Sequence, residues 1–175
     1  MQNDTVKVIC DEQGHSIVIV NDIRFLGRQN IKWDDVEKYL KGYINTNYEV
    51  LETADVIYIG SDLPSELKGS NDTRKLKGTY AKAKANATTE LPLLIKHAVN
   101  KRWQENFKLK RGVDAKYGWF RFTTRFALPV YDSNGELTRY NIFRIEMLVR
   151  HASDNRLYLY DLVNIKKETG TPPRH

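Results

Sequence analysis

Three β-like runs near the C-terminus constrain the fold of this chain more than any other feature. They extend over residues 120–130, 137–151 and 156–167, and β-branched and aromatic residues dominate each of them. The breaks at 132–135 and 153–155 contain Asp, Ser, Asn and Gly, which favour tight turns. Because short turns join antiparallel neighbours, the runs predict an antiparallel meander of three strands or more.

The two faces of the predicted meander differ in chemistry. Side chains alternate along a strand, so four apolar residues of the central run share one face: Phe143, Ile145, Met147 and Val149. The opposite face carries Arg144 and Glu146, together with Arg121 and Arg125 from the preceding run. A sheet of this kind buries its apolar face under helices. We therefore expect the polar face to carry the function.

The remaining segments predict an α+β fold in which helices pack against the meander. Short β-like runs at 5–10 and 16–21 flank a turn at 11–14 and indicate an N-terminal β-hairpin. Apolar residues at helical spacing predict helices over 33–44, 73–88 and 90–100, the last of which continues or kinks through 101–111. Two more short strands are expected at 48–51 and 55–60.

Charge divides the chain at a loop-like stretch, residues 69–72. Residues 1–67 carry 6 Lys/Arg and 12 Asp/Glu, residues 68–116 carry 13 and 4, and residues 117–175 carry 9 and 6. We therefore predict an acidic hairpin–helix–strand part over 1–67, either a subdomain or part of one single domain. A basic helical and meander part follows over 68–168, and a disordered tail over 169–175.

Several classes of protein are excluded by what the sequence lacks. No apolar run approaches the roughly 20 residues that span a bilayer, and the N-terminus has no secretory signal. The single Cys10 excludes an internal disulfide, which fits a cytoplasmic location without a membrane partner. Neither a phosphate-binding glycine loop nor a zinc or magnesium ligand set is present. We therefore predict no metal and no cofactor.

Metal-independent RNA cleavage is compatible with the polar face of the meander. It needs a base for the 2′-hydroxyl, an acid for the leaving oxygen and cations for the phosphate. Glu146 is the predicted base, and His151 or His97 is the predicted acid. Arginines suit the phosphate because of their planar, forked donors. The predicted phosphate-binding residues are Arg121, Arg125 and Arg144. Each of these residues also has a structural alternative, such as a cross-strand ion pair of Glu146 with Arg144 or Arg125.

A binding function without catalysis remains an alternative. Basic residues at 73–88 would then contact phosphates: Lys75, Lys77, Lys82 and Lys84. Tyr160 and Lys166 of the last run are further candidates for nucleic-acid contacts, and we expect RNA rather than DNA as the partner. A third alternative is a protein-interaction module, in which the acidic residues 1–67 meet a basic partner or cover the chain's own basic face.

Residues 73–168 resemble the nuclease superfamily that includes barnase, colicins and RelE, in the forms found in phage and conjugative-element polyvalent proteins. The resemblance is carried by the segment from Asn106 and Lys108 to 117–122, and by the runs 126–130 and 157–161. It implies helices followed by an antiparallel meander and endoribonuclease activity of a mobile-element type. It transfers no catalytic set residue by residue, and no histidine aligns clearly with Glu146.

Overall fold

The computed structural model describes residues 6–27, 30–105 and 113–171. Within these residues the chain forms one mixed sheet of eight strands and five α-helices, so the predicted α+β class is confirmed. None of the described helices is long and apolar enough to span a bilayer.

Three long strands form the centre of the sheet: β6 (Trp119–Tyr131), β7 (Leu137–His151) and β8 (Leu157–Thr171). Consecutive members of this trio pair antiparallel. They coincide closely with the three β-like runs of the sequence. β8 extends to Thr171, so the predicted tail over 169–175 is wrong for its first residues, and residues 172–175 lie outside the described chain.

Shorter strands extend the sheet on both sides of the central trio. β1 (Val8–Cys10) and β2 (Ser16–Ile19) pair antiparallel, and β2 then pairs parallel with β6. β3 (Asn47–Glu49) and β4 (Val56–Tyr58) also pair antiparallel, and β4 pairs parallel with β8. The strand order is therefore β1-β2-β6-β7-β8-β4-β3, with β5 pairing separately with β6.

β5 (Val99–Gln104) replaces the helix that we predicted to continue through 101–111. Helix α5 (Leu91–Lys96) ends earlier, and Asn100 takes a left-handed backbone conformation with φ 59°. That conformation cannot continue an α-helix, and the following residues pair with β6 instead. Residues 106–112 of the predicted helix lie outside the described chain.

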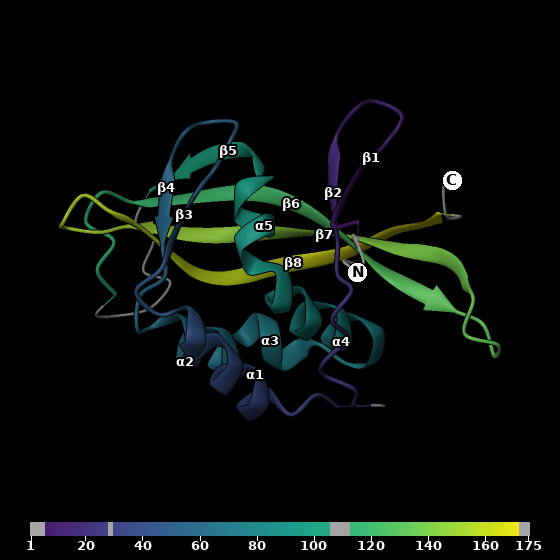
Figure 1. Ribbon diagram of the computed structural model, residues 1–175. Helices are drawn as coiled ribbons and strands as arrows, with labels where there is room; N and C mark the ends of the chain where they lie inside the picture. Colours follow the sequence, from purple (N-terminus) through teal and green to yellow (C-terminus); the bar gives the residue numbers. More distant parts are fainter. Residues whose placement is uncertain (1–5, 28–29, 106–112, 172–175) are drawn as a thin grey trace.

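Helices cover one face of the sheet (Figure 1). They are α1 (Trp33–Leu40) with a 3₁₀ turn at Lys41–Tyr43, α2 (Leu63–Gly69), α3 (Asn71–Lys75), α4 (Gly78–Ala87) with a 3₁₀ turn at Thr88–Glu90, and α5. One core lies between them and the sheet, and it contains the apolar residues of β7 that the alternation predicted. The core contains residues from both sides of the predicted boundary at 69–72. Leu63 and Leu67 precede the boundary, and Ala81 and Leu91 follow it.

The single helix predicted over 73–88 is wrong, because the chain breaks between α3 and α4. Leu76 and Lys77 are extended, and Gly78 has φ 58°, a conformation that glycine adopts without steric cost. Helix α4 packs closely against the rest of the protein. Ala81, Ala83, Ala85 and Ala87 are all buried, since their small side chains allow close approach from several sides.

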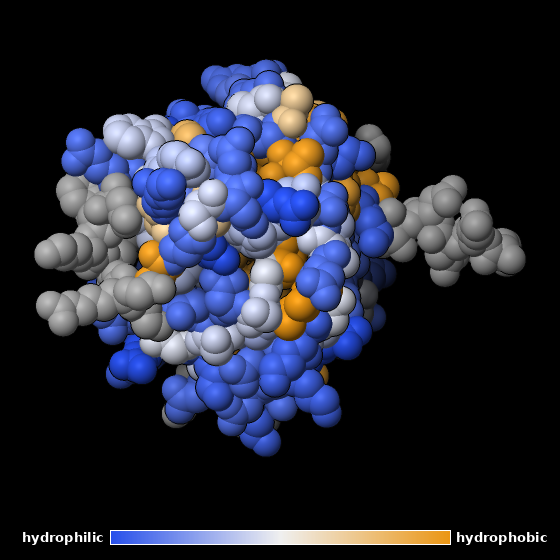
Figure 2. Space-filling view, turned by 90° about the vertical axis from the view of Figure 1, so that its left-hand side faces the viewer, coloured by the Kyte–Doolittle hydropathy of each residue, from blue (hydrophilic) through white to orange (hydrophobic). Residues whose placement is uncertain are grey.

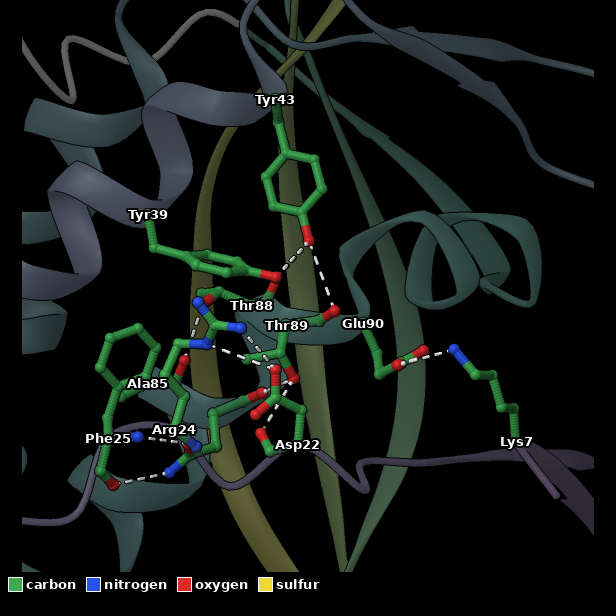
Figure 3. A network of polar contacts seen from close by, with 11 residues as sticks. Lys7, Asp22, Arg24, Phe25, Tyr39, Tyr43, Ala85, Thr88, Thr89 and Glu90 are labelled. Atoms are coloured by element: carbon green, nitrogen blue, oxygen red, sulfur yellow. Dashed lines mark hydrogen bonds and ion pairs between the residues drawn. The ribbon is translucent and has the colours of Figure 1, made fainter. Parts of the chain in front are cut away.

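A polar network fixes the segment between β2 and α1 against the end of α4 (Figure 3). The Asn86 Oδ1 atom accepts hydrogen bonds from the backbone N–H groups of Arg24 and Phe25 at 2.8 and 2.9 Å. The Tyr43 hydroxyl donates to the Thr88 carbonyl at 2.9 Å, and Lys7 pairs with Glu90 at 3.3 Å. The acidic and basic parts of the chain are therefore tied together by buried contacts as well as by the sheet.

Figure 2 faces the end of the sheet that carries the turn between β7 and β8, and it shows a mostly hydrophilic surface with small, separated hydrophobic areas.

Candidate functional site

An open depression of about 810 Å³ lies on the face of the sheet that the helices leave uncovered. We call it the charged hollow. Strands β5 to β8 form its floor, and the turn between β1 and β2 forms one wall. Its principal polar residues are Asp11, His15, Arg102, Thr123, Arg125, Arg144, Glu146, Asn164, Lys166 and Glu168.

Strand alternation explains why these side chains share one face. Thr123 lies directly opposite Glu146, and Arg125 directly opposite Arg144. Phe122 and Phe126, one position along, point into the buried core on the other face. This division between a buried apolar face and an open polar face agrees with the pattern of the sequence.

Glu146 lies at the centre of a dense set of ionic contacts. Its Oε2 atom accepts from Arg102 Nη2 at 2.9 Å. Its Oε1 atom accepts from Arg121 Nη1 at 3.0 Å and from Asn164 Nδ2 at 2.8 Å. The sequence predicted Arg144 or Arg125 as its ion-pair partner, but the arginines that contact it are Arg102 and Arg121.

These contacts determine the ionisation of Glu146. Partial burial raises the pKa of its carboxyl, but the hydrogen bonds from Asn164 and Arg121 and the charges of both arginines outweigh burial and hold the pKa below its ordinary value. A general base works best when its pKa lies near the working pH. Glu146 is therefore better suited to organising its cationic neighbours than to removing a proton.

Asn164 reaches Glu146 through a β-bulge. The register between β7 and β8 shifts between Arg144 and Glu146, and Asn164 has φ 56° within that shift. Asparagine tolerates this left-handed conformation better than most residues. The bulge re-aims the side chain of Asn164 toward the carboxylate, as bulges near functional sites often do.

A row of three cations crosses the charged hollow. Arg125 on β6 is directly opposite Arg144 on β7, and Arg144 is directly opposite Lys166 on β8. We call Arg125, Arg144 and Lys166 the cation row. Adjacent strands lie about 4.8 Å apart, so its backbone positions span roughly 10 Å. Like charges directly opposite one another destabilise a sheet unless anions compensate them.

The members of the cation row are compensated unequally. Arg125 donates to Asp11 Oδ2 at 2.7 Å and to Glu168 Oε2 at 2.9 Å. Arg144 and Lys166 are exposed and make no ion pair within the described chain. Two adjacent positive charges therefore face solvent in the hollow, ready to contact an anion.

Neither predicted acid lines the charged hollow. His151 lies at the end of β7, where its Nε2 atom is 2.7 Å from Asn155 Oδ1 and its ring packs against Tyr117 and Phe120. His97 follows α5 and lines an adjoining hollow. His15, an exposed residue at the turn between β1 and β2, lines both hollows. Its position depends on the parallel pairing of β2 with β6, which no local sequence signal indicated.

The lysines proposed for the binding alternative have different environments. Lys75 and Lys77 are exposed, and Lys82 is partly buried. Lys84 is 0% exposed, and its Nζ atom contacts Asp72 at 3.0 Å and Asp161 at 3.3 Å. The prediction that Lys84 contacts a nucleic acid is therefore wrong, because a buried and paired ammonium cannot reach a phosphate.

Tyr160 is also largely buried, away from the cation row. Its hydroxyl donates to Glu66 at 2.7 Å, and its ring packs edge-on against Trp119. Burial, followed by the hydrogen bond to Glu66, raises the pKa of Tyr160 above its ordinary value. It belongs to a small apolar cluster with Ala115, Leu148 and Val163. The predicted contact between Tyr160 and a nucleic acid is not supported by this position.

The described part of the chain contains no group of three or more His, Cys, Asp or Glu side chains arranged to hold a metal ion. In comparisons with known proteins, no family model, no curated protein and no solved structure matches this chain.

Proposed function

We propose that this protein binds RNA, with the cation row as the contact to successive phosphates. The observation that carries the proposal is the direct opposition of Arg125, Arg144 and Lys166 on three adjacent strands, of which the last two have no anionic partner in the described chain. Such an arrangement costs stability in the free protein. A bound phosphate would supply the missing compensation through charge-assisted hydrogen bonds.

The rest of the hollow supports a selective contact rather than a general basic surface. Arg102 and Arg121 share the Glu146 carboxylate, which compensates one of their two charges, and Arg125 pairs with both Asp11 and Glu168. The cations of the hollow that have no ion-pair partner in the described chain are Arg144 and Lys166. Phosphate contacts of this kind give affinity and position without reading the bases, so we expect binding to tolerate many sequences.

Metal-independent RNA cleavage is a second candidate function. A carboxylate, several arginines and a histidine lining one hollow favour it, because these are the groups that acid–base cleavage requires. The lowered pKa of Glu146 makes it a weak base, however, and RNA binding is therefore our first proposal.

The test compares two pairs of substitutions in RNA-binding assays. We expect Arg144→Ala with Lys166→Ala to weaken binding of a labelled single-stranded RNA roughly a hundredfold, since two charge-assisted contacts worth about 1.5 kcal/mol each are lost. The matched control is Lys75→Ala with Lys77→Ala, which removes the same net charge from exposed positions outside the hollow. It should change the affinity only slightly.

Two results would contradict this proposal. If the control pair weakened binding as much as the hollow pair, the basic segment around α3 would be the interface. If wild-type protein bound neither RNA nor DNA at low salt, the nucleic-acid function itself would be wrong.

A further inference from the structure

A second hollow of about 470 Å³ adjoins the charged hollow, and two histidines line it. Its polar lining includes His15, Glu52, His97, Asn100, Thr123 and Arg125. His15, Asn100, Thr123 and Arg125 line the charged hollow as well. A strand of RNA on the cation row would therefore lie beside His15 and next to the hollow that His97 lines.

Local structure fixes the backbone of each histidine. His15 ends the turn between β1 and β2, where its carbonyl accepts from the Asp11 N–H group at 3.0 Å and its own N–H group donates to Asp11 Oδ1 at 2.9 Å. His97 closes α5, with its N–H group donating to the Leu93 carbonyl at 3.0 Å. Both rings are thus presented from ordered elements rather than from a long loop.

The two histidines have different electrostatic surroundings. His15 Nδ1 lies 3.6 Å from Asp11 Oδ2, and the hydrogen bond from Arg125 helps to lower the pKa of Asp11 to about 2. The Asp11 carboxylate lies on the Nδ1 side of the His15 ring and leaves Nε2 for a substrate. Burial, and then the charge of Lys96, lower the pKa of His97, so this ring is neutral near pH 7.

We propose that His97 is the general base and His15 the general acid of a metal-independent RNA cleavage reaction in this second hollow. The inference rests on the proposed RNA-binding function and assigns to that site a reaction and a substrate, a single-stranded RNA with a free 2′-hydroxyl. Glu146 then holds Arg102 and Arg121 in place, and does not transfer protons.

The reaction balances without a further reagent. His97 takes the proton of the 2′-hydroxyl, the 2′-oxygen forms a bond to phosphorus, and the bond from phosphorus to the 5′-oxygen breaks. His15 gives its proton to that 5′-oxygen. The products are a 2′,3′-cyclic phosphate and a 5′-hydroxyl end, and each histidine is left in the opposite protonation state. Arg125, which lines both hollows, supplies positive charge for the phosphate in the transition state.

The charged groups around the pair are few and can be named. Asp11 and Arg125 lie on the side of His15, and Lys96 precedes His97 on α5. Glu52 lines the hollow from the turn between β3 and β4, where its Oε2 atom accepts from the Asn100 N–H group at 3.0 Å. The rate should therefore rise with pH as His97 loses its proton, with a midpoint below 6.5.

The experiment measures binding and cleavage separately, in the presence of EDTA. Binding is followed with an RNA whose 2′-hydroxyls are methylated, and cleavage with the unmodified RNA, whose product ends are identified by mass. We expect His15→Ala and His97→Ala each to slow cleavage about 10²–10⁴-fold while binding stays at the wild-type level. His151→Ala is the matched control, since His151 lines neither hollow, and it should cleave normally. His97→Gln serves as a second variant at this partly buried position, and a urea titration checks that it is folded.

Each result decides the question. Loss of cleavage in both variants, with cyclic phosphate ends on the products of the wild-type protein, supports the pair. Wild-type protein that binds the methylated RNA but leaves unmodified RNA intact overturns the cleavage proposal and leaves the binding function standing. Wild-type rates in His15→Ala or in both His97 variants also overturn it. Absence of binding by the wild type removes both proposals.

Discussion

Replacing Lys84 by Met would remove a fully buried ammonium group while keeping most of the side-chain volume. Lys84 is 0% exposed and Asp161 is 2% exposed, and the Lys84 Nζ atom lies 3.3 Å from Asp161 Oδ1 and 3.0 Å from Asp72 Oδ2. Removing one partner of a buried ion pair leaves an uncompensated charge, which costs about 3–5 kcal/mol. We expect Lys84→Met to lose unfolding free energy of that size at pH 8.

The loss should depend on pH in a definite direction. Burial raises the pKa of Asp161 from 3.8 to about 6, even though the charge of Lys84 lowers it. A carboxyl whose pKa is raised by folding favours the folded state at low pH, and this contribution is lost as pH rises through the folded pKa. Without Lys84 that pKa rises further. The deficit of Lys84→Met should therefore be smaller near pH 5 than near pH 8.

Urea denaturation at both pH values, followed through tryptophan fluorescence, to which the buried Trp119 contributes, measures the effect. Lys82→Met on the same helix is the control, because Lys82 is partly exposed and surface substitutions usually change stability by about 0.5 kcal/mol or less. Adding Asp161→Asn to Lys84→Met should restore much of the loss, since the amide oxygen can still accept from the Leu162 N–H group. A deficit below about 1 kcal/mol at pH 8 would refute the reasoning.

Three further predictions concern the charged hollow. Asp11→Asn should strengthen RNA binding severalfold at low salt, because it removes one counter-charge of Arg125. The control Asp22→Asn removes a carboxylate that pairs with Arg24 and should leave the affinity unchanged. Equal affinities for both variants would contradict the role of Asp11. Glu146→Gln should also strengthen RNA binding, because Arg102 and Arg121 lose their counter-charge. A fall in affinity in the same assay would argue for a direct contact between Glu146 and RNA. Asn164→Ala should lose about 1–2 kcal/mol more unfolding free energy than Asn164→Gly, because glycine adopts a φ of 56° without steric strain and alanine does not. Equal losses in urea titrations would show that the backbone is not strained at this position.

The long strands could be predicted because the information that specifies them is local. The run at 137–151 coincides with β7, and the runs on either side differ from β6 and β8 by a few residues. Alternation of apolar and polar side chains specifies which face of each strand is buried, and turn residues mark where the strands end. The open face of the sheet, with Arg125, Arg144 and Glu146, followed from that pattern.

The partners across the hollow could not be predicted, because they depend on contacts between remote segments. Arg102 pairs with Glu146 because β5 is a strand beside β6, whereas its sequence indicated a helix. His15 reaches the hollow through the parallel pairing of β2 with β6. The burial of Lys84 likewise depends on Asp161, which is far along the chain and provides one of its counter-charges.

The salt dependence of RNA binding tests the central claim most directly. Each phosphate contact with a single strand contributes about 0.7 to the slope of log Kd against log salt concentration. The account predicts that Arg144→Ala with Lys166→Ala lowers this slope by about 1.4 relative to the wild type, while Lys75→Ala with Lys77→Ala leaves it unchanged. An unchanged slope in the Arg144 and Lys166 double variant would contradict the assignment of the cation row as the RNA contact.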